Sequence, residues 1–135
     1  VQWDDSMHAG FTTGDPWLPV NPNNTEVNAA AAIADEHSVF HHYRRLVELR
    51  HTVPVVAHGD FTMLLPDDEV VYAFTRSLDD VELLVVANFS GEPVQPDLDL
   101  TGWSDADVLL DNVETSGAPG WSGRLEPWQA VVLQR

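Results

Sequence analysis

The pattern of apolar residues changes near residue 52, and this change constrains the fold more than any other feature of the 135-residue chain. After Pro54, short runs rich in β-branched and apolar residues alternate with turn residues such as Pro66-Asp67-Asp68 and Leu78-Asp79-Asp80. The runs are 61–65, 70–75, 81–89, 108–110, 123–125 and 129–133, and glycine and proline between 116 and 123 indicate a loop. Several short strands separated by turns predict an antiparallel sandwich or small barrel.

The alternation within these runs predicts which side chains face the core. These are Phe61, Leu65, Val71, Phe74, Leu84, Val86, Phe89, Val131 and Leu133. Three tryptophans, Trp103, Trp121 and Trp128, also fall in this half of the chain. We interpret them as core or inter-domain contacts rather than as a platform for sugar binding, because scattered tryptophans in a sandwich usually pack inward.

The first 51 residues have a different character. Glycine and proline interrupt residues 1–28, so no regular element is predicted there. The alanine-rich segment Asn28 to Ala34 predicts a short helix, and Ser38 is a suitable N-cap for a second helix from Val39 to Arg50. Apolar residues gather on one flank of that second helix, which therefore needs a surface to pack against.

The charge balance excludes several classes of partner. The chain has 22 acidic residues, six arginines and no lysine, for a net charge of −16. Nucleic acids and anionic membranes require a cationic surface, so neither is an expected partner. No apolar run approaches the roughly 18 residues of a membrane span. The chain has no cysteine, which excludes a disulfide scaffold and fits a cytoplasmic location.

Several segments resemble those of one enzyme family, in order along the chain. Gln2-Trp3-Asp4 resembles the end of the Arg-Thr-Pro-Met-Gln-Trp-Asp motif of oligo-1,6-glucosidase-type enzymes, in glycoside hydrolase family 13 of the α-amylase superfamily. Val1 stands where that pattern has Met, and the Arg-Thr-Pro is not in the chain. The helix from Ser38, the Asn88-Phe89 strand and the closing Leu125 to Leu133 segment also fit the family, although Trp128 and Gln129 replace its usual Tyr-Glu.

The resemblance implies an architecture of two parts. Residues 1–51 would be the end of a catalytic (β/α)8 barrel, with a loop and the last barrel helix, and residues 52–135 would be the β-sandwich called domain C. The chain would be the carboxyl-terminal portion of a retaining α-glucosidase that hydrolyses terminal α-glucosidic bonds of short oligosaccharides. The upstream barrel of the same polypeptide would be its partner, and without it the exposed helix favours self-association.

Two other interpretations stay open. One is a self-standing β-sandwich that binds carbohydrate or another partner. The other is a portion of a related trehalose synthase or sucrose-active enzyme. The close spacing of Trp3, His8 and Phe11 favours the glucosidase interpretation over a linker.

The resemblance gives substrate-binding candidates but no catalytic residue. A retaining glycosidase needs two carboxyl groups about 5 Å apart, and in this family both lie upstream of the matched loop. The chain alone is therefore expected to be inactive. Trp3 and Phe11 would stack against a sugar ring, Gln2 and Asp4 would hydrogen-bond hydroxyl groups, and His8 would lie in the same pocket. Anchoring of the loop is the alternative role for these residues.

Histidines and carboxylates elsewhere do not indicate a metal or cofactor. His37 and His41 are four residues apart, but no cysteine or patterned carboxylate completes a zinc site. No segment matches a calcium-binding loop or a phosphate-binding glycine loop. We therefore expect neither a metal nor a cofactor.

Overall fold

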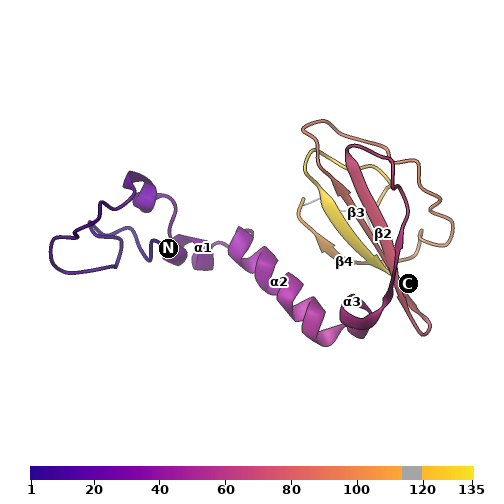
Figure 1. Cartoon of the computed structure of the whole chain (residues 1–135), viewed down its shortest axis with the longest axis horizontal. Helices are drawn as coiled ribbons and strands as arrows, with labels where there is room; N and C mark the ends of the chain where they lie inside the picture. Colours follow the sequence, from indigo (N-terminus) through magenta and orange to yellow (C-terminus); the bar gives the residue numbers. More distant parts are fainter. Residues whose placement is uncertain (114–119) are drawn as a thin grey trace. The chain divides into compact units, whose positions relative to one another are not determined.

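The computed structural model describes residues 1–113 and 120–135, so part of the loop predicted between 116 and 123 lies outside the described residues. The described chain divides into two compact units, Val1–Glu48 and Leu49–Arg135 (Figure 1). This division falls three residues before the predicted domain boundary after residue 51, which remains a prediction.

The first unit contains short helices joined by irregular backbone. A 3-10 helix, η1, covers Pro22–Thr25, and α1 covers Ala29–Ala34. The side chain of Asn28 caps α1 by accepting a hydrogen bond of 2.8 Å from the amide of Ala31. The short alanine-rich helix predicted here is thus confirmed, with an asparagine satisfying one of its free amide groups.

The longest helix, α2, covers Val39–Thr52 and crosses the division between the units. Ser38 precedes it as predicted, and its hydroxyl accepts a long hydrogen bond of 3.5 Å from the amide of His41. The helix extends two residues beyond the predicted end at Arg50. None of its residues is buried, and the exposed flank includes Tyr43, at 67% exposure, together with Val47, at 41%.

The second unit is built on one five-stranded antiparallel sheet with the order β1-β2-β3-β5-β4 (Figure 1). Its strands are β1 (Asp60–Met63), β2 (Val71–Leu78), β3 (Val81–Asn88), β4 (Asp107–Asp111) and β5 (Ala130–Gln134). A two-residue turn joins β2 to β3, since Leu78 pairs with Val81. Asp79 takes the left-handed conformation, with φ at 52°, that such a turn requires.

A short helix that the sequence pattern did not predict lies between α2 and the first strand. This helix, α3, covers Pro54–His58, because proline fixes the backbone angle needed at a first helical position. The side chain of Arg76 on β2 donates hydrogen bonds to the carbonyls of Val55 (3.2 Å) and Gly59 (2.7 Å). A Cβ atom at Gly59 would lie 2.6 Å from the Val55 carbonyl oxygen, so only glycine fits this close approach.

The core lies on one face of the sheet, beneath a second layer of mostly irregular backbone. Val94 and Leu125 form an isolated antiparallel bridge in that layer. The core residues from both layers are Val71, Ala73, Leu84, Val86, Trp103, Leu125, Val131 and Leu133. The predicted domain-C type of antiparallel sandwich, mainly β in content, is confirmed.

The tryptophans of this unit take different positions. Trp103 is buried, and the Arg135 guanidinium lies 4.2 Å from the centre of its ring. Trp121 packs against the core at its edge. Trp128 is 62% exposed, so a core position is wrong for this residue, and a contact with another domain remains a prediction.

Six of the nine predicted inward side chains contact the core, and three phenylalanines do not. Val71, Ala73 and Thr75 are the buried residues of β2, so Phe74 lies on the opposite face of the strand. Phe61 is on the edge strand β1, none of whose residues is buried, and its ring lies 5.1 Å from that of Phe74. Phe89 follows the end of β3 and is 63% exposed.

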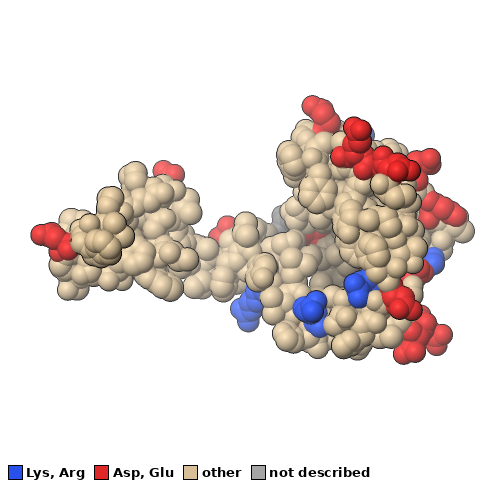
Figure 2. All heavy atoms as spheres, in the orientation of Figure 1, with Lys and Arg blue, Asp and Glu red and all other residues tan. Residues whose placement is uncertain are grey.

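Carboxylates dominate the charged surface visible in Figure 2. Of the 22 acidic residues in the sequence, 15 belong to residues 49–135. Within the described residues, no helix is both long and apolar enough to cross a membrane.

Candidate functional site

The segment from Trp3 to Phe11 forms a loop closed by its own backbone. The amide of Trp3 donates to the carbonyl of Ala9 (2.9 Å), and the amide of Ala9 donates to the carbonyl of Ser6 (2.9 Å). Ala9 is fully buried with φ at 50°, and Gly10 follows with φ at 72°. A Cβ atom at Gly10 would lie 2.9 Å from both the Trp3 Cβ and an Asp4 carboxylate oxygen, so glycine allows the loop to close.

This loop is attached to the beginning of α1. The amides of Ala29 and Ala30 donate to the carbonyls of Gln2 (2.8 Å) and Trp3 (3.0 Å). These are amide groups at a helix N-terminus that have no partner within the helix. The exposed first turn of α1 therefore holds the Gln2-Trp3 backbone in place.

Two buried asparagines connect the loop to the helix from the other side. Asn24 is 7% exposed, and its side-chain amide donates to the carbonyl of Ser6 (2.8 Å). Asn28 is 9% exposed and donates in turn to the carbonyl of Asn24 (2.8 Å). The position of the loop thus depends on a chain of hydrogen bonds, because little apolar surface is buried around it.

The side chains of Gln2 and Asp4 are already engaged within the unit. The Gln2 amide donates to the carbonyl of Asn21 (3.4 Å) and to the side chain of Asn23 (3.1 Å). The Asp4 carboxylate accepts hydrogen bonds from the amide and hydroxyl of Ser6. Asp4 therefore stabilises its own turn in this structure.

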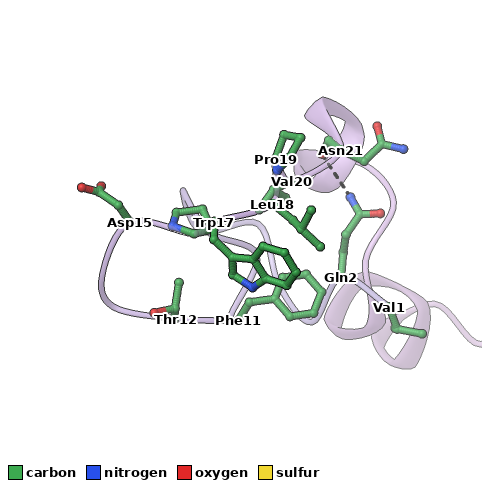
Figure 3. Close-up of a pocket in the computed structure, with 11 residues that line it drawn as sticks. Val1, Gln2, Phe11, Thr12, Asp15, Trp17, Leu18, Pro19, Val20 and Asn21 are labelled. Carbon is green, nitrogen blue, oxygen red and sulfur yellow. Dashed lines mark hydrogen bonds between the residues drawn. The ribbon is translucent and has the colours of Figure 1, made fainter.

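A pocket of about 620 Å³ opens beside Gln2, within the size range of small-molecule sites. Figure 3 shows its walls, which include Gln2, Phe11, Trp17, Leu18, Pro19 and Asn21. All of these residues belong to the first unit.

The five predicted binding residues divide into two groups. Gln2 and Phe11 line the pocket. Trp3, Asp4 and His8 are not among its lining residues and belong to the closed loop, where Trp3 is 56% exposed and His8 is half-buried. Which of the five contact a substrate remains a prediction.

Among the lining residues that the sequence interpretation missed, Trp17 is the aromatic one. It is 91% exposed and lies within Pro16-Trp17-Leu18-Pro19. The prolines were interpreted only as breaks in regular structure. The prolines on both sides of the tryptophan were the sequence signal that could have predicted an exposed aromatic side chain on a restricted backbone.

His41, on α2, makes structural contacts. The Nε2 atom of His41 lies 2.9 Å from the carbonyl oxygen of Ile33, near the end of α1. Among the residues that the structure describes, no group of three or more histidine, cysteine, aspartate or glutamate side chains is placed to hold a metal ion.

Two family descriptions match the chain in succession. "Alpha amylase, catalytic domain" matches residues 1–59, and "Maltogenic Amylase, C-terminal domain" matches residues 61–132. Among curated relatives, an oligo-1,6-glucosidase from Parageobacillus thermoglucosidasius is 41% identical over 99% of this chain and 24% of its own length. A trehalose-6-phosphate hydrolase from Bacillus subtilis is 38% identical with the same coverage.

Solved structures give the same result. Isomaltulose synthase from Klebsiella sp. LX3 superposes with a TM-score of 0.87 and 38% identity, over 98% of this chain and 24% of that protein. Trehalose-6-phosphate hydrolase from Bacillus licheniformis gives a TM-score of 0.84 and 39% identity, over 99% and 25%. The chain thus spans about a quarter of the length of the relatives it matches, and it belongs to glycoside hydrolase family 13 of the α-amylase superfamily, with a C-terminal domain of the maltogenic-amylase type.

Proposed function

We propose that the chain is the carboxyl-terminal portion of a retaining α-glucosidase that hydrolyses terminal α-glucosidic bonds of short oligosaccharides. The observation that carries this proposal is the ordered pair of family matches, with the end of an alpha-amylase catalytic domain followed directly by a maltogenic-amylase C-terminal domain. The proposed boundary after residue 51 lies near both the end of the first match and the division between the compact units. A cytoplasmic location is part of the proposal and rests on the absence of cysteine from the sequence.

The proposed role of this portion is to support and complete a substrate site whose catalytic carboxylates lie upstream. Gln2, Trp3, Asp4, His8 and Phe11 are the proposed contacts with a small α-glucoside. The hydrogen bonds that fix Gln2 and the closed loop support this role, because a binding group that is already held in place loses little entropy when a ligand arrives. The chain alone is proposed to be inactive.

The proposed partner of this portion is the catalytic barrel of a longer polypeptide. The much greater length of the relatives supports this. On α2, the exposed flank forms a hollow of about 420 Å³ lined by Val39, Phe40, Tyr43, Arg44 and Val47. Exposed apolar surface of this kind is costly in water and favours a partner. In the isolated chain we propose that a second copy covers it.

A self-standing binding module is less well supported. Such a module would gain nothing from a first unit whose longest helix has no buried residue. Synthases acting on other sugars are the closer alternative, since a trehalulose synthase structure is 43% identical to this chain with a TM-score of 0.82. Measurement of the reaction products distinguishes a synthase from a hydrolase.

A chimaera tests the proposed function. The chain replaces the corresponding carboxyl-terminal quarter of the Parageobacillus thermoglucosidasius oligo-1,6-glucosidase, and hydrolysis of isomaltose and p-nitrophenyl α-glucoside is measured. We expect the chimaera to be active and the 135-residue chain alone to match a blank. A folded but inactive chimaera would contradict the proposal, as would activity of the chain alone that Asp4→Asn abolishes.

Light scattering tests the proposed self-association of the isolated chain. The double variant Tyr43→Ser, Val47→Ser should be monomeric at concentrations where the unmodified chain forms a dimer. The matched control is Arg45→Ser, a change on α2 outside the hollow. A monomeric unmodified chain would rule out association through α2.

A further inference from the structure

The helix α1 is too short to be stable by itself. It has six residues, Ala29–Ala34, and none of them is buried. Isolated helices shorter than about 12 residues are marginal in water, because few hydrogen bonds offset the cost of nucleation. Yet the first amides of α1 hold the carbonyls of Gln2 and Trp3, at the start of the closed loop. The position of that loop therefore depends on the contacts that keep α1 helical.

The carboxyl end of α1 is held by two side chains, one just before α2 and one in its first turn. The hydroxyl of Ser38 donates to the carbonyl of Ala32 (2.6 Å), and the Nε2 atom of His41 lies 2.9 Å from the carbonyl oxygen of Ile33. A carbonyl oxygen can only accept, so Nε2 carries the proton in this bond. Carbonyls in the last turn of a helix have no partner within the helix, and here these two side chains supply the partners.

The two ends of α1 lie close enough for one to affect the other. A helix rises about 1.5 Å per residue, so the six residues of α1 span about 9 Å. Helix formation is cooperative, and loss of a partner at the carboxyl end should therefore also loosen the amides at the amino end. α1 thus connects the first turn of α2 with the closed loop through hydrogen bonds.

His41 is the support of α1 that can be removed with the least effect on α2. The hydroxyl of Ser38 also accepts a hydrogen bond from the backbone amide of His41 (3.5 Å), so loss of this hydroxyl would weaken both helices. The imidazole of His41 instead reaches back to Ile33, with its edge against the neighbouring ring of Phe40. A glutamine side chain carries an amide donor at a similar reach, so His41→Gln retains a donor for the carbonyl.

We propose that His41 is a positioning residue for the closed loop, because its bond to Ile33 stabilises α1 and α1 fixes the Gln2-Trp3 backbone. The inference rests on the proposed function, in which Gln2 and Trp3 contact a small α-glucoside. Binding is weaker when only a fraction of the molecules holds the binding groups in place. The imidazole therefore supports substrate binding without contacting the substrate.

Hydrogen exchange of the 135-residue chain, followed at single amides by NMR, tests the connection from His41 to the loop. His41→Ala should accelerate exchange about 5-fold at the amides of Ala29 and Trp3, whereas His41→Gln should stay within about 2-fold of the unmodified chain. His42→Ala is the matched control, because it removes the adjacent imidazole of α2 and leaves His41 in place. Faster exchange at Ala29 with an unchanged rate at Trp3 would confine the effect to the helix and overturn the proposal, as would unchanged rates at both amides.

The chimaera with the Parageobacillus thermoglucosidasius enzyme tests the consequence for substrate binding. His41→Ala should raise the KM for isomaltose about 3- to 5-fold and leave kcat within about 2-fold, since loss of binding that is equal in the ground state and the transition state changes KM alone. His41→Gln should restore the KM. An unchanged KM, or a fall in kcat alone, would overturn the proposal. An inactive chimaera without these changes would instead refute the proposed function, and the exchange rates of the 135-residue chain would still decide whether His41 positions the loop.

Discussion

The two units of this chain reach a defined structure by different means. In residues 1–48 the buried positions are Ala9, Asn24 and Asn28, and the order of the backbone comes from hydrogen bonds among loop groups. Residues 49–135 instead enclose a continuous cluster of buried aliphatic side chains and Trp103. The first unit holds surface groups in position, while the second has the apolar core that confers stability.

The difference also appears in what each unit leaves exposed. The first unit exposes Trp3, Phe11 and Trp17 around a pocket and an adjacent loop. On the second, the exposed rings of Phe61 and Tyr72 lie on the face of the sheet away from the core. A polar network can present aromatic groups to a ligand because it does not need them for its own core.

Truncation of a core side chain should produce the largest contrast between the units. Leu84 is 1% exposed and pairs with Leu133 across the sheet, so Leu84→Ala should destabilise the second unit by about 4 kcal/mol. The matched change Ile33→Ala, at a position 56% exposed, should cost less than about 1 kcal/mol. Urea unfolding followed by circular dichroism measures both. If both variants lost the same free energy of unfolding, the difference in packing between the two units would not correspond to a difference in stability.

The second unit also contains a polar pair, the buried Gln129 and the half-buried Asp111, on which its stability should depend. Gln129 is 1% exposed, and its side chain donates to both carboxylate oxygens of Asp111 (2.9 and 2.8 Å). Gln129→Glu would place a second carboxylate against the first and should cost about 3 kcal/mol.

Adding Asp111→Asn to the Gln129→Glu variant should recover most of that loss, because one partner is again an amide. Thermal unfolding of the two single variants and the double variant measures the coupling. If the stability changes of the two single variants simply added in the double variant, Gln129 and Asp111 would not be coupled as proposed. Gln129 stands where the family usually has glutamate.

A smaller effect is expected in the first unit from loss of its hydrogen-bond chain. Asn28→Ala removes both the cap of α1 and the donor to Asn24, and should destabilise this unit locally by about 1 to 2 kcal/mol. Hydrogen exchange at Ala29 and Ala30 should accelerate while the strands of the sheet stay protected. Asn28→Asp retains the acceptor for Ala31 and should recover part of the loss. Acceleration across the sheet as well would show that the two units do not unfold separately.

The smallest effect concerns acid stability of the second unit. The backbone amide of Val70, and then that of Val71, hydrogen-bond the Asp68 carboxylate and hold its pKa below the ordinary value of 3.8. A lowered pKa in the folded state means that the stabilisation is present above the unfolded-state value and is lost as the pH falls through the folded-state value.

Asp68→Asn tests this dependence. The difference in melting temperature between the variant and the unmodified chain should be largest near neutral pH and should narrow below about pH 4. Because Asp68 is exposed to solvent, the difference should be slight. If the difference in melting temperature instead grew as the pH falls, the Asp68 carboxylate would not stabilise the folded state in the way assigned here.

Local pattern was sufficient to predict much of the fold. The turns at Pro66 and Asp79, most runs of β-branched residues and the asparagine before the alanine run act over a few neighbouring positions and produced the elements they predict. The run 123–125 is the exception, because it forms only an isolated bridge at Leu125 rather than a strand. The resemblance of Gln2-Trp3-Asp4 and the closing strand to one family was also legible in the sequence alone, and the family matches confirm it.

The tertiary structure decided what local pattern could not. Val71 and Phe74 cannot both face inward from one regular strand, and the register of β2 against β3 selected the face that carries Val71 and Ala73. The pocket likewise depends on contacts between segments that are distant in the sequence. Gln2 and Trp17 come together because the chain turns back through Asn21 and Asn24 to the start of α1. Sequence spacing specifies contacts within a turn of helix or along a strand, whereas contacts between distant segments depend on which buried polar and apolar groups find partners once the chain is folded.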